Sequence, residues 1–142
     1  MADPRSANSF EFALRPHQVA TFVHDDTIVY DAAETNGSAQ VGLAVTVESS
    51  NVVSLVGDGE SVLGKLLRVD SDGFCSVQHE GFMELPGGDS AVLTAGAKIV
   101  GDLASGAAEG YIQVATADGV HDLVSRGMII DASTATAVVV KL

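Results

Sequence analysis

The chain is short of cysteine, aromatic residues and long apolar runs, and each shortage excludes a class of protein. Its single cysteine, Cys75, cannot form an internal disulfide, so a disulfide-stapled scaffold is excluded. Two tyrosines, five phenylalanines and no tryptophan leave few platforms on which sugars or bases stack. No stretch approaches the roughly 18–20 apolar residues of a membrane span, and the apolar run 137–140 has only the length of a strand.

Basic residues are also scarce. Seven lysines and arginines stand against 19 acids, which gives a formal net charge of −12. A chain this acidic is a poor candidate for binding nucleic-acid phosphates or an anionic membrane surface. No base lies between Arg15 and Lys65, so we expect this segment to present a negative surface. The segment contains seven acids, namely Asp25, Asp26, Asp31, Glu34, Glu48, Asp58 and Glu60.

The composition nevertheless favours a folded domain. Hydrophobic residues make up 46% of the 142 positions, which argues against disorder. A chain of this length can bury roughly 68–70% of its unfolded surface without disulfides or metals. We therefore expect one β-rich domain over residues 16–142, preceded by an N-terminal arm over residues 1–15.

Short β-branched runs between turn residues predict many short strands. Alternation is clear over 40–48, and Asp72-Gly73 between the runs 62–69 and 74–79 is a strong hairpin signal. A second hairpin is predicted from 19–23 and 27–30, whereas the small residues of 103–110 predict a loop.

The fold class follows from these patterns. Turn signals about every 8–12 residues and the lack of long helical periodicity predict an all-β fold, either a β-sandwich or a small β-barrel with short turns. We expect at most one short helix, over about 118–126, with Asp118 as its N-cap and Gly127 as its C′ residue.

Two motifs resemble ligand loops but lack a necessary residue. Residues 59–65 match G-x-x-x-x-G-K, but Leu66 follows where a phosphate loop needs Ser or Thr to bind Mg²⁺. Residues 70–73 resemble the start of a calcium loop, but Gly81 replaces the glutamate at loop position 12. We interpret both motifs as turns beside strands.

No arrangement of catalytic or metal-binding residues stands out. Cys75 and His79 are four residues apart, which separates them by about 13 Å along a strand, so we expect Cys75 to be buried and inert. No G-x-S-x-G elbow occurs. The expectation is therefore a protein that is not an enzyme and uses no cofactor or metal.

The arm contains the candidate contact residues. Phe10, Phe12 and Leu14 alternate with polar or small residues, and Arg15 ends the run before Pro16. An apolar pattern outside the core predicts a docking element, and the alternative is an edge strand of the same domain. Phe10, Phe12, Leu14 and Arg15 are the residues we expect to touch a partner.

Sequence pieces spread over residues 41–142, roughly 70% of the chain, carry a family resemblance. They are VGDG (56–59), VLGKLLRV (62–69), DG (72–73), VQ (77–78), GFMELPGG (81–88), LTAGAKIVG (93–101), GYI (110–112), RGMIID (126–131) and TAVVV (136–140). In this order they resemble the small capsid cement, or decoration, proteins of tailed bacteriophages.

The resemblance implies a structural function without catalysis. Members of this family sit on the outside of an icosahedral head, often as homotrimers, and bridge neighbouring major-capsid subunits against the pressure of packaged DNA. The expected partners are thus the major capsid protein, further copies of this chain and neighbouring cement proteins, with no nucleic acid and no membrane. The alternative function is a small-ligand-binding or accessory β-barrel module, which would need a pocket with a few convergent polar groups.

The expected location is the outer surface of a virion assembled in a host cytoplasm. The first nine residues are small and polar, and they contain no apolar core of signal-peptide length. The single cysteine is compatible with a reducing compartment.

Overall fold

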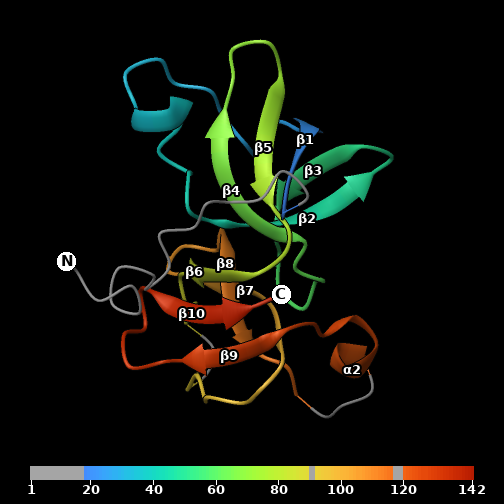
Figure 1. The fold of residues 1–142 in the computed structure, drawn as a ribbon, viewed down its shortest axis with the longest axis vertical. Coiled ribbons are helices and arrows are strands. Elements are labelled where there is room, and N and C mark those ends of the chain that lie inside the picture. The colour runs from blue at the N-terminus through green and yellow to red at the C-terminus, as the bar shows by residue number, and fades with distance from the viewer. Residues whose placement is uncertain (1–17, 90–91, 117–119) are drawn as a thin grey trace, which may run out of the picture.

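A computed structural model describes residues 18–89, 92–116 and 120–142 of the chain (Figure 1). The described part is almost entirely β-structure, which confirms the predicted fold class. Its strands are β1 (Val19–His24), β2 (Ala44–Ser49), β3 (Val52–Leu55), β4 (Gly64–Val69), β5 (Phe74–Gln78), β6 (Phe82–Leu85), β7 (Ile99–Ala104), β8 (Ala108–Val114), β9 (Met128–Asp131) and β10 (Val138–Lys141). The helical segments among these residues include a 3₁₀ turn, η2 (Thr35–Gly37), and a short α-helix, α2 (Val120–Val124).

The first five strands form a closed barrel in the order β1-β3-β2-β4-β5, with β5 returning to β1. β1 runs parallel to β3 and antiparallel to β5, and it places Phe22 opposite Cys75. Buried side chains fill the barrel interior, as expected for a barrel of so few strands. They are Ile28, Val45, Val53, Leu55, Leu66, Val69, Cys75 and Val77.

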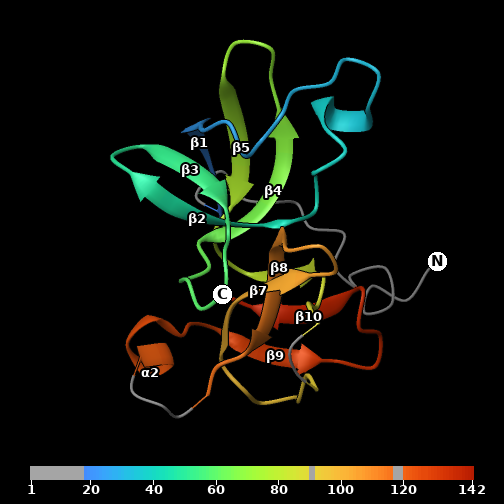
Figure 2. The ribbon, with the colours of Figure 1, turned by 180° about the vertical axis from the view of Figure 1, so that it is seen from behind.

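The remaining strands form a second β-region below the barrel in Figure 1. β10 lies between β6 and β9 in an antiparallel sheet, and β7 pairs with β8 as a hairpin. The hairpin lies behind this sheet in Figure 1 and in front of it in Figure 2, so it covers one side of the sheet. A second apolar core fills the space between them, with Met83, Leu85, Ile99, Ile112, Ile129, Val138 and Val140 among its buried members.

β2 connects the two cores. Val45 points into the barrel core while its neighbour Ala44 packs into the second core, because successive strand residues face opposite sides. Backbone hydrogen bonds cross the same boundary, including one from the Gly110 N–H to the Val56 carbonyl.

The Arg126 side chain crosses the boundary as well. Its guanidinium donates to the carbonyls of Val62 (3.2 Å), Leu63 (2.9 Å) and His79 (2.9 Å). These carbonyls belong to the segments that enter β4 and leave β5. Arg126, which directly precedes the β9 region, therefore ties the second region to the barrel.

Two local predictions are confirmed in outline. β4 and β5 pair as the predicted hairpin, with Gly73 at φ +88° in the turn and Asp72 Oδ1 accepting from the Phe74 N–H. α2 lies within the predicted helical segment, although Asp118, the expected N-cap, falls outside the described residues.

Two other predictions are wrong. Residues 27–30 do not pair with β1, because Thr27 is held in a turn by Asp25 and accepts a hydrogen bond from the Leu55 N–H. Residues 103–110 are not simply a loop, since β7 and β8 continue through most of them and turn at 105–107. Gly106 and Ala107, both at positive φ, make that turn tight.

Candidate interaction surfaces

One side of the β6–β10–β9 sheet points away from the second core. Met83, Leu85, Val138 and Val140 face inward, so the alternate residues of these strands face outward. We call this surface the outer face and define it as Phe82, Glu84, Met128, Ile130, Asp131, Val139 and Lys141. Met128 is 49% exposed and Ile130 is 45% exposed, so two large apolar side chains are accessible on one strand of this face.

The strand register arranges most of the outer face in two rows. Val139 lies opposite Glu84 on β6 and opposite Asp131 on β9, so the first row has acids on both sides of a valine. Lys141 lies opposite Phe82 and Met128, so the second row has apolar residues on both sides of a lysine.

A bulge shapes the β9 side of this surface. The register shifts between Val139 and Val140, and Ile130 is the extra residue on β9. Asp131 Oδ1 accepts a hydrogen bond of 2.8 Å from the Ser133 N–H. This bond, with a weaker contribution from the Ser133 hydroxyl, holds the pKa of Asp131 below its usual range, so the carboxylate stays charged near neutral pH.

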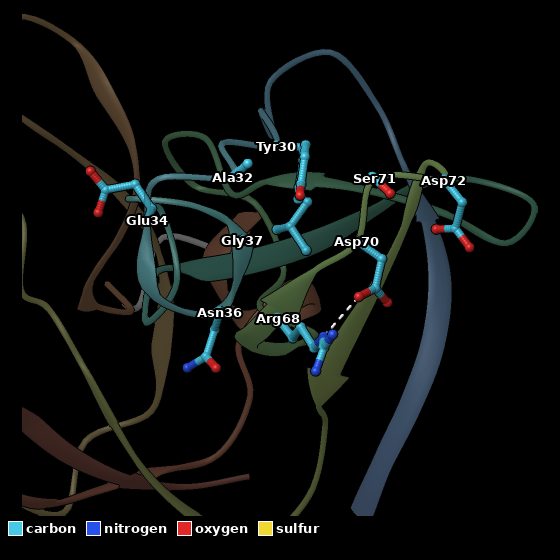
Figure 3. Close-up of a pocket in the computed structure, with 10 residues that line it drawn as sticks. Tyr30, Ala32, Glu34, Asn36, Gly37, Arg68, Asp70, Ser71 and Asp72 are labelled. Carbon is cyan, nitrogen blue, oxygen red and sulfur yellow. Dashed lines mark hydrogen bonds and ion pairs between the residues drawn. The ribbon is translucent and has the colours of Figure 1, made fainter.

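The second candidate surface is a polar hollow at the far end of the barrel (Figure 3). It has a volume of about 500 Å³. The loop between β1 and β2 forms one wall and the β4–β5 hairpin forms the other. The lining residues are Tyr30, Ala32, Glu34, Asn36, Gly37, Arg68, Val69, Asp70, Ser71 and Asp72.

Local sequence explains why the hollow has this shape. Asn36 and Gly37 adopt φ +58° and +85°, the left-handed region that Asn and Gly tolerate best. A side chain at position 37 would overlap the Val69 carbonyl oxygen, so this glycine permits the loop to lie directly on β4. Gln40 secures the other end of the loop by accepting from the Val29 N–H and donating to the Thr27 carbonyl.

Charge in the hollow is predominantly negative. Arg68 Nε donates to Asp70 Oδ1 at 2.7 Å, which leaves Glu34 and Asp72 as the further charges of the lining. Of these acids only Glu34 lies between Arg15 and Lys65, the segment for which a negative surface is predicted, since Asp70 and Asp72 follow that segment. Within residues 18–89, 92–116 and 120–142, no group of three or more His, Cys, Asp or Glu side chains could hold a metal ion.

The two loop motifs adopt structures that suit turns. The residues after Gly64 form β4, whereas a phosphate loop needs a helix there. Glu60 Oε2 accepts from the Gly57 N–H at 2.8 Å and so closes a local turn. Residues 70–73 form the β4–β5 turn.

Cys75 is buried in the barrel core as predicted. Burial raises the pKa of its thiol to about 11, and the nearby Asp70 charge adds to this rise. A thiol with so high a pKa carries almost no thiolate at neutral pH, and it is therefore a poor nucleophile.

The predicted contact residues Phe10, Phe12, Leu14 and Arg15 lie outside the described residues. Sequence reasoning missed the outer face, although part of its signal was present in the alternation of Met128 and Ile130 around Ile129. Alternation shows that a strand has two different faces, but it does not show which of the two faces packs on the core.

No family model, no curated protein and no solved structure matches this chain. Among the described residues, no helix is both long enough and apolar enough to cross a membrane.

Proposed function

We propose that this chain is a structural decoration protein, which binds the outer surface of an icosahedral phage head and bridges neighbouring major-capsid subunits. One structural observation supports this proposal above the others. Two dissimilar interaction surfaces, the outer face and the acidic hollow, lie on separate β-regions that are joined by a shared strand. A bridging protein needs at least two contact surfaces held at a fixed spacing.

The sequence resemblance supplies the second support. The pieces that resemble phage cement proteins run through both β-regions, from residue 56 to residue 140. Together with the all-β architecture, they favour a rigid body whose function depends on binding and not on turnover.

The stabilising mechanism is thermodynamic linkage. A protein that binds the assembled shell more tightly than its separated subunits stabilises the assembly by mass action. Many copies of moderate affinity add their effects over the lattice, and linked contacts in a homotrimer raise the effective affinity further. The acidic surface of the barrel region would bind a basic patch on the capsid partner, because complementary charges speed the association of two proteins and orient them.

The arm provides the first test of this function. Removing residues 1–15 should leave a folded domain that no longer decorates heads, because Phe10, Phe12, Leu14 and Arg15 would be lost. Binding is measured by cosedimentation with heads from the phage whose genome encodes the chain.

The matched control removes only residues 1–8, which precede the apolar pattern that begins at Phe10. This shorter deletion should decorate normally. Unchanged decoration by the longer deletion, with circular dichroism showing the fold intact, would contradict the assigned role of the arm.

The hollow favours a second candidate function, the binding of a small ligand by an accessory β-barrel module. The lining of Tyr30, Asn36, Asp70 and Asp72 offers an aromatic ring and several polar groups in one place. A fragment screen followed by NMR distinguishes the two functions. Saturable shifts confined to the hollow residues would support a ligand module, and their absence together with head binding would support decoration.

A further inference from the structure

We propose that the outer face is a two-fold contact between two copies of this chain. This contact differs from the three-fold association that the family resemblance implies. It would link copies on neighbouring sites of a lattice through the outer face, so that the capsid contacts of the proposed function would fall to the acidic hollow and the arm. It concerns the isolated protein, so it does not require the proposed function to be correct.

The two rows of the outer face are complementary to each other. A two-fold axis parallel to the rows and lying between them places the first row of one copy over the second row of its partner. Lys141 of one copy then lies over Val139 of the partner, with Glu84 and Asp131 on the neighbouring strands about 4.8 Å to each side. The same operation brings the second copy's lysine to the first copy's acids.

The apolar residues meet in the same arrangement. Phe82 and Met128 flank Lys141 on the neighbouring strands. In the pair, Phe82 therefore lies over the side chain of the partner's Glu84, and Met128 lies over the partner's Asp131. Ile130, which is 45% exposed in one chain, lies beside these contacts. Met128 thus gains cover, while the lysine gains carboxylate partners.

Local charge, and not net charge, favours a second copy as the occupant. The net charge of −12 repels any acidic partner, a second copy included, so the attraction must come from Lys141 of each copy meeting Glu84 and Asp131 of the other. Basic partners are better served by the barrel end with its excess of acids. Two barrel ends repel each other for the same reason. The outer face carries Lys141 near both Glu84 and Asp131, so the same face of a second copy can offer acids to the lysine and a lysine to the acids.

The size of the face sets the expected strength. Four residues along each of three strands span about 13 Å by 10 Å, which is well below the roughly 800 Å² per partner of a standard interface. We therefore expect weak association that needs high protein concentration to be seen. Fixing copies at high local concentration on a lattice would make so weak a contact effective.

Sedimentation equilibrium of the full chain between 0.02 and 2 mM, in ~50 mM salt, tests the proposal. Wild type should pass from monomer toward higher mass through a species of two copies. K141E should lose this association by at least tenfold in dissociation constant, because the introduced carboxylate would face the partner's two acids. E84K should also weaken it, because the introduced ammonium group would face the Lys141 side chain of the second copy.

Mixing the two variants gives the decisive result. The outer face of E84K has one more cation than wild type, whereas the outer face of K141E has only acids as its charged groups. An equimolar mixture should therefore associate more tightly than either variant alone. The control is K98E, which reverses the charge of an exposed lysine outside the outer face and should associate like wild type.

The outcomes separate clearly. Monomeric wild type at 2 mM, or a mixture that associates no better than its components, overturns the two-fold contact. Equal losses in K98E and K141E would also overturn it, because net charge alone would then control association. Head decoration by a protein that fails this test would leave the proposed function standing.

Discussion

The barrel and the second β-region differ in the residues that they place on the sides of their strands that face away from the core. On the barrel, the outward positions are mixed: Thr21, Lys65 and Ser76 are polar, whereas Val47 (54% exposed) and Phe74 (41% exposed) are apolar. On the β6–β10–β9 sheet, the outward positions Met128 and Val139 are apolar. Both regions bury a well-filled apolar core, so the difference does not come from folding requirements.

The comparison separates structural residues from interaction residues. A sheet with one face on a core ordinarily places polar residues on its other face. The barrel follows this rule only in part, because its exposed Val47 and Phe74 lie on β2 and β5, which do not pair with each other. The second region instead places Met128, Ile130 and Val139 on neighbouring strands of one sheet, which is why we propose a partner for that face.

The largest predicted effects test whether the two regions fold as one unit. Leu66→Ala in the barrel core and Ile112→Ala in the second core each remove a fully buried side chain. Each should lower the free energy of unfolding by about 2–5 kcal/mol. Because Ala44 and Val45 join the cores through one strand, each variant should shift a single transition in urea, followed by circular dichroism. Two separate transitions, with each variant moving only one, would contradict this coupling.

The second prediction concerns the bond between the regions. Arg126→Met keeps the apolar stem but leaves the carbonyls of Val62, Leu63 and His79 without their charged donor. The free energy of unfolding should fall by about 1.5–3 kcal/mol. Lys98→Met, at an exposed position, should change it by less than about 0.5 kcal/mol. Equal effects of the two substitutions would show that Arg126 does not join the regions.

The barrel strands were largely predictable because their signals are local. Asp72-Gly73 between two alternating runs predicts a hairpin because Asp and Gly tolerate the positive φ that a tight turn needs. The structure shows this hairpin as the β4–β5 pair. The parallel pairing of β1 with β3 was not predictable, because it joins segments that are distant in the sequence.

The errors have a physical cause as well. The run 27–30 has strand-like composition, but the hydrogen bonds of Asp25 and Thr27 satisfy the backbone in a turn. The small residues of 103–110 suggested a loop, but small residues also permit close packing of a strand, as at Gly110 in β8, where a side chain would meet that of Leu43. The outer face depends on which sheet side the β7–β8 hairpin covers, and that is a tertiary property.

The third prediction concerns Cys75, the single cysteine of the chain, which lies in the barrel core. Its thiol pKa is about 11 in the folded chain against 9.0 ordinarily, so the unfolded chain releases this proton first as pH rises. The stability contribution is therefore complete below about pH 9 and is lost between about pH 9 and 11. Urea unfolding over this range should show a steeper fall for the native chain than for Cys75→Ala.

Thiol labelling gives an independent reading of the same group. At pH 8 the folded chain should react with a disulfide reagent about 100-fold more slowly than the unfolded chain, from the difference in thiolate fraction alone. Equal labelling rates would show that the barrel core is open to solvent.

The smallest predicted effect is at the barrel end. Arg68 and Asp70 form an exposed ion pair, with 65% and 38% of their side chains accessible. Arg68→Ala should change the free energy of unfolding by less than about 1 kcal/mol, because exposed pairs are well solvated. A larger loss would mean that the hollow is a structural element and not an interaction surface.

Stoichiometry on intact particles tests the central claim most directly. If a phage genome encodes this chain, as the proposed function requires, DNA-filled heads purified from infected cells are quantified by mass spectrometry for this protein and the major shell protein. The account predicts a fixed copy ratio that persists through repeated density-gradient purification and saturates when extra protein is added. A protein that is absent from purified heads, or present at a ratio that falls with every purification step, would contradict it.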